Sequence, residues 1–175
     1  GKTLAAFLWC LDGLIRAALE GTLGDETRVV YVSPLKALGN DVQKNLLAPL
    51  EQIRALAATK GIVLPEIRVQ VRTGDTTQAE RAQMLRRPPH VLITTPESIF
   101  LLLTAQRGRE LLRTVQTVVV DEIHALARDK RGSHFALSVE RLRQLVPAPP
   151  QLVGLSATVK PIDRIAAFLT GSEPV

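Results

Sequence analysis

The sequence is poor in cysteine, in aromatic residues and in long apolar runs. Cys10 is the single cysteine, which excludes an internal disulfide and a multi-cysteine metal cluster and predicts a reducing, cytoplasmic location. One Trp, one Tyr and four Phe are too few for the aromatic platform on which single-strand binders stack bases. No apolar stretch approaches the ~18 residues of a membrane span. We therefore expect no membrane partner, and we expect any binding of nucleic acid to depend on contacts with its phosphates.

The composition describes one folded domain with a basic charge balance. Hydrophobic residues make up 46% of the 175 residues, enough for a sizeable core, which excludes intrinsic disorder and collagen-like repeats. Phe7, Trp9 and Cys10 of the first apolar segment are expected to belong to that core. The 22 Lys and Arg against 17 Asp and Glu give a net charge of +5, which invites a polyanionic partner without requiring one.

Apolar and β-branched runs alternate with helical patterns along the whole chain. The runs that predict buried strands cover residues 28–33, 67–73, 91–94, 117–121 and 151–155. The patterns that predict helices cover residues 4–19, 38–47, 49–58, 77–86, 97–103, 134–145 and 162–169. Because nearly apolar strands alternate with helices, we predict an α/β domain with a parallel sheet of about five strands and helices on both faces.

Small polar and charged residues follow every predicted strand. These segments are 33–36, 73–76, 94–97, 121–124 and 156–158. Parallel α/β sheets bind ligands at the carboxyl ends of their strands, so we expect a ligand site there. The alternative is that these residues are ordinary helix N-caps, as Thr77 is expected to be in a capping box with Glu80. A cap does not account for Lys36, or for two acids and a histidine after one strand.

The chain begins with Gly1-Lys2-Thr3 and an apolar helix, which match the end of the phosphate-binding pattern G-x-x-x-x-G-K-[ST]. In that pattern the N–H groups of a helix start and the lysine hold nucleotide phosphates, and the hydroxyl binds Mg²⁺. For the three residues alone, a solvated helix start is the better interpretation. The rest of the sequence changes that balance.

Two acids, Asp121 and Glu122, end the valine-rich strand 117–121. One acid at that place can hold the Mg²⁺ of a nucleotide, and the next can orient the attacking water. The alternative is that both acids only stabilise a helix start through its dipole, by about 0.3–1 kcal/mol each. Combined with Gly1-Lys2-Thr3, the two acids favour nucleotide hydrolysis.

The motifs together resemble those of a known helicase superfamily. Asp121-Glu122-Ile123-His124 resembles motif II of the superfamily 2 helicases, and Ser156-Ala157-Thr158 resembles their motif III. Residues 31–38, 72–76, 94–98 and 130–134 are similar to segments of the large helicase-related (Lhr) family within it. The resemblance implies that residues 1–175 form a first RecA-like P-loop NTPase domain of DEAD/DEAH type. It also implies that the strand before Gly1 and the second RecA-like domain are missing.

The resemblance implies roles at a nucleotide site. Gly1, Lys2 and Thr3 would bind ATP, Thr3 and Asp121 would hold Mg²⁺, and Glu122 would act as the catalytic base, with Lys2 and Asp121 as its catalytic partners. Further residues would couple this site to nucleic acid, namely His124, Ser156, Ala157 and Thr158. An ordinary helix-start histidine and a small-residue turn remain the alternatives for the coupling residues.

The resemblance also implies a track for nucleic acid. Its residues would be Pro34, Leu35, Lys36, Thr73, Gly74, Thr95, Pro96 and Arg131. Backbone and hydroxyl contacts to phosphate suit these residue types and carry no base sequence. The alternatives are that Thr95 and Pro96 only start a helix, and that Arg131 belongs to a solvated basic face with Arg128 and Lys130. A helix start and a phosphate contact are compatible.

The implied function is that of an ATP-dependent helicase motor domain. The resemblance implies 3′-to-5′ movement on single-stranded DNA in a repair setting, with RNA–DNA hybrids as a further substrate and a second RecA-like domain as partner. Without that domain's arginine finger, which contributes about 10³–10⁵ in rate in related hydrolases, the isolated chain should be a weak ATPase. The alternative is a nucleic-acid-binding module without catalysis of its own.

Overall fold

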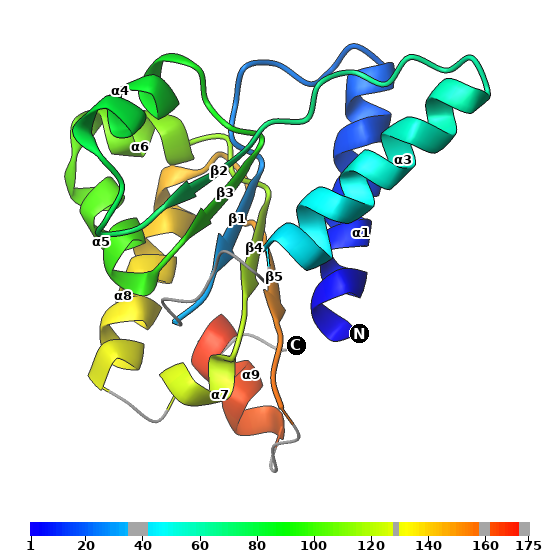
Figure 1. Ribbon diagram of the computed structural model, residues 1–175. Coiled ribbons are helices and arrows are strands. Elements are labelled where there is room, and N and C mark those ends of the chain that lie inside the picture. Colours follow the sequence, from blue (N-terminus) through cyan, green and yellow to red (C-terminus); the bar gives the residue numbers. More distant parts are fainter. Residues whose placement is uncertain (35–41, 128–129, 158–161, 172–175) are drawn as a thin grey trace.

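The computed structural model describes residues 1–34, 42–127, 130–157 and 162–171. Five strands form one parallel sheet in the order β2-β3-β1-β4-β5 (Figure 1). The strands are β1 (Val29–Val32), β2 (Val69–Arg72), β3 (Val91–Thr94), β4 (Thr117–Val120) and β5 (Gln151–Gly154). The predicted α/β class and the parallel sheet of five strands are confirmed, and each strand lies within its predicted range.

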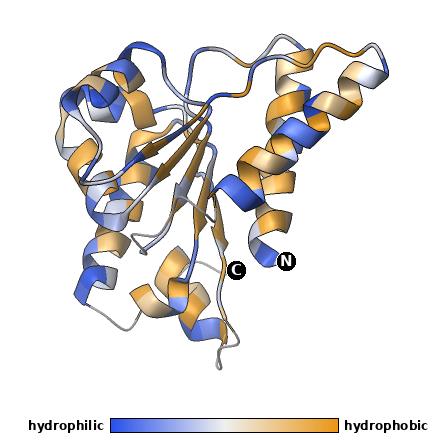
Figure 2. Cartoon of the chain, in the orientation of Figure 1, coloured by the Kyte–Doolittle hydropathy of each residue, from blue (hydrophilic) through white to orange (hydrophobic). Residues whose placement is uncertain are grey.

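Helices cover both faces of the sheet, as predicted. Helices α1 (Lys2–Leu19) and α3 (Ala48–Thr59) lie on one face, and α5 (Pro96–Thr104), α6 (Gln106–Leu112) and α8 (Lys130–Leu145) lie on the other (Figure 1). Successive strand residues point to opposite faces. In β1, Val29 and Tyr31 therefore join the core beneath α1, while Val30 and Val32 join the core of the opposite face. Figure 2 shows the apolar strands enclosed between these two layers.

The remaining helical segments lie around the sheet. They are η1 (Gln43–Leu47), a π-helix that runs directly into α3, and α4 (Gln78–Arg86), α7 (Ile123–Leu126) and α9 (Ile162–Thr170). The helix predicted over 38–47 is described only from residue 42 onward. Leu169 of α9 packs into the same core as α8, so the end of the described chain covers the face opposite α1.

Helix α1 is amphipathic. Its buried residues include Phe7, Cys10, Leu11 and Leu14, spaced three and four apart, as on the core-facing stripe of a helix. Burial of a side chain such as Leu11 contributes about 1.5–3 kcal/mol. The expectation that Trp9 packs in the core is wrong, because its side chain lies off this stripe and is 54% exposed. In the part of the chain that the structure describes, no helix is long and apolar enough to cross a membrane.

Two predicted helix caps are present at the carboxyl edge of the sheet. Thr77 Oγ1 accepts a hydrogen bond from the Glu80 N–H at 3.3 Å, and the Thr77 N–H donates to Glu80 Oε2 at 2.8 Å, which completes the capping box. At α5, Thr95 Oγ1 accepts from the Ser98 N–H at 3.3 Å, and Pro96 occupies the first helical position. These caps fix where the two helices begin.

Two short helices, α6 and α7, were not predicted. Helix α6 contains Gly108, which lowers helix propensity. A Cβ at Gly108 would lie 2.2 Å from the Leu102 carbonyl oxygen, so glycine is what lets α6 approach α5. Helix α7 has four residues, too few for a periodic pattern. Both helices owe their place to packing rather than to local sequence.

Candidate functional site

The segments that follow the strands lie along one edge of the sheet. Val32 of β1 stands level with Thr94 of β3 and Val120 of β4, and Val120 stands level with Gly154 of β5. Since all five strands are parallel, the residues after them share that edge. The described candidate residues after the strands therefore lie along one edge of the sheet, as the sequence predicted.

The start of α1 reaches this edge. Gly1 is the N-cap residue of α1, and the Nζ of Lys2 donates a hydrogen bond to the carbonyl oxygen of Ser156, 154 residues away in the sequence. Thr3 follows in the same turn. The first N–H groups of a helix have no intrahelical partner and carry partial positive charge, which suits an anion.

The carboxylate of Asp121 is held by two donors. Its Oδ1 accepts a hydrogen bond from the N–H of Glu122 at 2.9 Å, and its Oδ2 accepts one from the hydroxyl of Tyr31. The N–H of Asp121 continues the ladder by donating to the Val32 carbonyl oxygen at 2.8 Å. Asp121 is thus fixed directly at the end of β4.

Glu122 turns the chain from β4 into α7. Its backbone is left-handed, with φ 48° and ψ 38°, and it is the one non-glycine residue with positive φ in the described ranges 1–34, 42–127, 130–157 and 162–171. An L-residue in that conformation costs about 1–2 kcal/mol. Strained residues of this kind cluster at active sites and ligand clamps.

His124 bridges the ends of β4 and β5. Its Nδ1 accepts a hydrogen bond from the N–H of Ala157 at 3.3 Å and lies 3.2 Å from Ser156 Oγ. Because a backbone N–H can only donate, the ring proton belongs on Nε2, which lies 3.1 Å from Glu122 Oε2 and donates to it. A continuous path therefore runs from Lys2 through Ser156 and His124 to Glu122.

These side chains fit a nucleotide with Mg²⁺. Hydroxyl and carboxylate oxygens, as in Thr3 and Asp121, are ligands that Mg²⁺ prefers, and the Lys2 ammonium suits phosphate. Among the described residues there is no group of three or more His, Cys, Asp or Glu that could hold a metal ion. Mg²⁺ in nucleotide sites needs no such group, since one or two carboxylates and the phosphates hold it.

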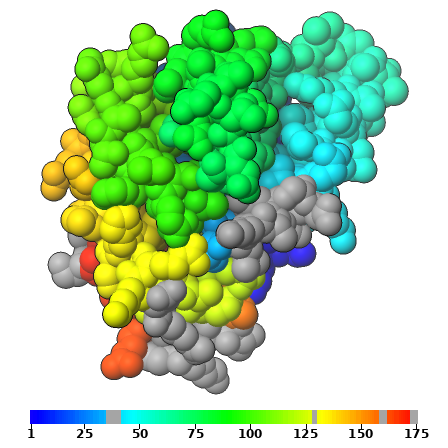
Figure 3. Space-filling view, turned by 60° about the vertical axis from the view of Figure 1, so that its left-hand side comes forward, coloured from blue at the N-terminus to red at the C-terminus, as the bar shows by residue number. Residues whose placement is uncertain are grey.

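A hollow lies at the same edge. It encloses about 610 Å³ beneath the ends of β1, β2 and β3. Its lining includes five of the eight predicted track residues, Pro34, Thr73, Gly74, Thr95 and Arg131, together with Asp75, Glu97, Ser98 and Leu101. Figure 3 views the face on which the green segments around α4 and α5 meet the yellow start of α8. We call this hollow the edge groove.

Of the other predicted track residues, only Pro96 belongs to the described structure, and it is not among the residues that line the edge groove. Pro96 is buried in the first turn of α5, where it fixes the helix start. Leu35 and Lys36, like the coupling residue Thr158, lie outside the described residues.

One ion pair crosses the edge groove. Arg131 Nε lies 2.7 Å from Glu97 Oε1, and another guanidinium nitrogen of Arg131 lies 3.5 Å from the Pro34 carbonyl oxygen. Partial burial opposes ionisation of Glu97, but hydrogen bonds and charge from Arg131 outweigh it and hold the Glu97 pKa below its usual range. The pair joins the start of α5 to the start of α8.

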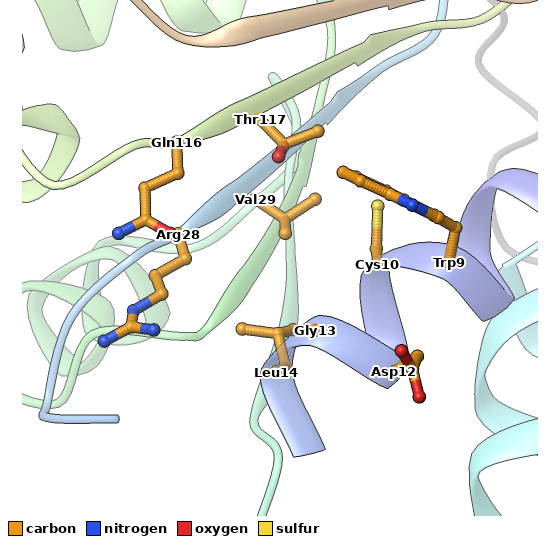
Figure 4. Close-up of a pocket in the computed structure, with 9 residues that line it drawn as sticks. All are labelled: Trp9, Cys10, Asp12, Gly13, Leu14, Arg28, Val29, Gln116 and Thr117. Atoms are coloured by element: carbon orange, nitrogen blue, oxygen red, sulfur yellow. The ribbon is translucent and has the colours of Figure 1, made fainter. Parts of the chain in front are cut away.

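A further hollow of about 280 Å³ lies at the opposite edge of the sheet. Figure 4 shows its lining, which includes Trp9 and Cys10 of α1 and the first residues of two strands, Val29 and Thr117. Burial raises the pKa of the Cys10 thiol to about 11, so the thiol stays protonated at neutral pH. This hollow is remote from Asp121 and forms no part of the candidate site.

Sequence patterns predicted no role for Tyr31, which contacts the candidate metal ligand Asp121. The alternation of side chains along a strand could have indicated this contact, since residues two apart point to the same face of the sheet. Tyr31 is the third residue of β1, paired with Val119, and Asp121 lies two residues beyond Val119, on the same face.

The parallel sheet, the phosphate-type helix start and the acids after β4 define a RecA-like nucleotide-binding domain. The chain belongs to the DEAD/DEAH box helicase family, whose family model matches residues 1–165.

Two of the similar proteins are Lhr helicases. The chain is 55% identical over 174 residues to the "Lhr helicase/ probable uracil glycosylase" of Mycolicibacterium smegmatis and 55% identical over 171 residues to the "ATP-dependent helicase Lhr-Core" of Methanothermobacter thermautotrophicus. The matches cover 99% and 98% of this chain. The chain spans 11% and 20% of the lengths of these two proteins.

Two solved structures are similar to this chain. The helicase Lhr of Mycobacterium smegmatis, bound to ssDNA and AMP-PNP, superposes with a TM-score of 0.90 at 53% identity, covering 99% of this chain and 22% of that one. The DEAD-box helicase Mss116 superposes with a TM-score of 0.75 at 19% identity, covering 97% of this chain and 32% of that one, a likeness of fold alone.

Proposed function

We propose that this chain is the ATP-binding motor domain of an ATP-dependent nucleic-acid helicase of Lhr type. The observation that carries the proposal is the path from Lys2 through Ser156 and His124 to Glu122, which lies on the same sheet edge as the edge groove. Support also comes from the Lhr relatives, one of which was solved with ssDNA and AMP-PNP.

The nucleotide would bind where α1 starts. Gly1, Lys2 and Thr3 would meet its phosphates, with Lys2 exchanging its contact to the Ser156 carbonyl for the β- and γ-phosphates. Thr3 and Asp121 would hold Mg²⁺, which neutralises charge that develops on the phosphates. The two Oδ atoms of Asp121 accept hydrogen bonds from the Tyr31 hydroxyl and the Glu122 N–H, which supports this proposal.

Glu122 would act on the attacking water. Its carboxylate is half exposed and can accept a proton from water, while the Nε2–H of His124 holds it in place. When nucleic acid moves the turn that contains Ser156 and Ala157, the hydrogen bonds to His124 Nδ1 would change with it. We infer that this is how hydrolysis and nucleic-acid binding are coupled.

The edge groove would hold the nucleic-acid backbone. Thr73, Gly74 and Thr95 offer hydroxyl and backbone groups, and Arg131 offers a guanidinium, all of which suit phosphate and none of which selects a base. Single-stranded DNA is the substrate that we propose. Movement in the 3′-to-5′ direction, action on RNA–DNA hybrids and a repair setting remain predictions from the resemblance, and a cytoplasmic location remains a prediction from the single cysteine.

The domain would work with further parts of a longer chain. In the described residues β5 pairs with β4 alone, and a hollow of about 240 Å³ beside it is lined by Ala6, Trp9, Cys10, Val119, Gln151 and Val153. We propose that a strand before Gly1 pairs with β5 and covers this hollow. Trp9 is the single tryptophan, so its fluorescence should be readily quenched by iodide here and shielded in an extended chain. A second RecA-like domain would complete the nucleotide site.

The deciding experiment uses the full-length chain that contains this domain. Glu122→Gln should abolish ATP hydrolysis while ATP still binds, and Lys2→Ala should lose both. Glu110→Gln on α6, remote from the site, is the matched control and should hydrolyse ATP normally. Wild-type turnover in Lys2→Ala and Glu122→Gln would refute the proposal.

A second candidate is a nucleic-acid-binding module without catalysis of its own. The observation that favours it is that the edge groove is lined without any residue of the nucleotide site. This function predicts that the chain of 175 residues binds single-stranded DNA equally well with and without ATP, and less well as salt rises.

A further inference from the structure

Tyr31 is a buried residue with a polar end. Its side chain is 2% exposed, and its ring stacks on Phe7 of α1 with centroids 4.6 Å apart and an angle of 29° between the rings. Burying a hydroxyl is unfavourable unless it finds a hydrogen-bond partner. The partner here is a functional side chain, since the Tyr31 hydroxyl donates to Asp121 Oδ2.

The sheet register brings the two residues together. Tyr31 of β1 pairs with Val119 of β4, and Asp121 follows two residues later, so both side chains point to the α1 face. The other Asp121 oxygen, Oδ1, accepts from the Glu122 N–H at 2.9 Å. One donor on each oxygen fixes the carboxylate plane.

We infer that Tyr31 is a positioning residue for the metal-binding carboxylate of Asp121 and that, with Phe7, it ties the phosphate-binding helix α1 to the acids after β4. This inference rests on the proposed function. Groups that hydrogen-bond a metal ligand orient it, and their loss lowers metal affinity by roughly 10–100-fold. Tyr31 would orient Asp121 from β1, a strand to which the sequence motifs assign no nucleotide contact.

The contact has a consequence for α1 as well. Phe7 lies five residues, about 1.4 turns, beyond Lys2 on α1, and its ring stacks on the ring of Tyr31. A shift of α1 when phosphate binds at its start would press on Tyr31, and Tyr31 contacts Asp121 directly. The Phe7–Tyr31 stack thus connects the phosphate helix to the metal ligand through side chains of the core.

The test is Tyr31→Phe in the full-length chain, which removes the hydroxyl and keeps the ring. The readout is the Kd of a fluorescent ATP analogue measured with and without Mg²⁺. We expect the gain in affinity that Mg²⁺ gives to fall by roughly 10–100-fold, with the Mg²⁺-free Kd unchanged within about twofold. A role confined to folding would change both values together, or neither.

The matched control is Thr27→Val. Thr27 is fully buried and its hydroxyl donates to the Pro89 carbonyl oxygen at 2.7 Å, away from the site. It should lower the melting temperature without changing the Mg²⁺ dependence. A second variant, Phe7→Leu, keeps the Tyr31 hydroxyl but removes the ring beneath it, and should lose a smaller part of the Mg²⁺ gain.

The outcomes separate the inference from the proposed function. If wild type shows a Mg²⁺-dependent gain that Tyr31→Phe and Phe7→Leu keep in full, the inference is overturned and the proposed function stands. If wild type binds the ATP analogue with no Mg²⁺-dependent gain, both are overturned. A selective loss of the gain in Tyr31→Phe supports both.

Discussion

The Nε2 atom of His124 lies 3.1 Å from Oε2 of Glu122, while the opposite nitrogen of the same ring faces the turn after β5. One imidazole therefore contacts a candidate base and a backbone segment that belongs to another strand. A neutral ring with its proton on Nε2 satisfies all of these contacts.

Replacing His124 should separate ATP binding from its stimulation by nucleic acid. In the full-length chain, His124→Ala removes the donor to Glu122 and the acceptor for Ala157. Since a hydrogen bond to a charged group contributes about 1.5–3 kcal/mol, DNA-stimulated ATP hydrolysis should fall by roughly 10–100-fold. The Kd for ATP should stay within about twofold. Steady-state rates with and without single-stranded DNA measure this effect, and equal losses of basal and stimulated rates would contradict it.

Arg131 should contribute one phosphate contact in the edge groove. Arg131→Gln should weaken binding of single-stranded DNA and reduce the slope of log affinity against log salt by about 0.7. Arg16→Gln on α1 is the control, since Arg16 also pairs with an acid, Asp12, at 2.8 Å but lies on an exposed face of another helix. Fluorescence anisotropy over a salt series gives both slopes. Equal slopes in the two variants would show that Arg131 makes no phosphate contact.

Two glycine-to-alanine changes should have opposite effects on stability. A Cβ at Gly132 would lie 2.0 Å from the Leu126 carbonyl oxygen, so Gly132→Ala should push α8 from α7 and lower the free energy of unfolding by about 1–3 kcal/mol. Gly13 lies inside α1, where an added Cβ would meet open space, so Gly13→Ala should raise it by about 0.5–1 kcal/mol. Urea denaturation measures both. A stabilising Gly132→Ala would refute the close approach.

His90 should make the fold sensitive to mild acid. Its Nδ1 accepts from the Arg68 N–H at 3.1 Å, and its Nε2 donates to the Gly24 carbonyl oxygen at 3.2 Å. In a protonated ring Nδ1 would carry a hydrogen, which would face the Arg68 N–H and lose that hydrogen bond. Burial, followed by the charge of Arg68, lowers the His90 pKa, although the hydrogen bond to the Gly24 carbonyl and the charges of Asp25 and Glu66 oppose this. The neutral form is the folded form, so this contribution is complete above about pH 6.5 and is lost as the pH falls through the lowered pKa.

The variant His90→Gln keeps one donor and one acceptor and cannot titrate in this range. Its melting temperature should change less than that of the wild type between about pH 7.5 and about pH 5.5. The same acid dependence in both proteins would show that another group is responsible.

Sequence patterns predicted most of the fold because local and global preferences agree here. The valine-rich strand 117–120 and the caps at Thr77 and Thr95 are each fixed by a few neighbouring residues. Helix α6 and the exposure of Trp9 were missed because they depend on what lies next to them in space. A short helix with a central glycine carries no periodic signal, and an apolar residue on an amphipathic helix does not reveal its face.

The residues of the candidate site could be predicted from the sequence, but their hydrogen-bond and ion-pair partners could not. Motif residues such as Asp121 and His124 could be named from spacing, and the structure brings those among the described residues to one edge. Their partners could not be named, because Tyr31 reaches Asp121 only through the register of β1 against β4. The pairing of Arg131 with Glu97 likewise joins segments 34 residues apart in the sequence.

The left-handed backbone at Glu122 lowers thermal stability at a residue that the proposed ATP hydrolysis requires. Glycine adopts this conformation without the steric penalty, so Glu122→Gly should raise the melting temperature even as it removes the proposed base. Screening variants of this domain for heat resistance alone would therefore favour inactive proteins at this position. Directed evolution of a more heat-stable domain would need to retain Glu122 and gain stability at other positions, for example through Gly13→Ala.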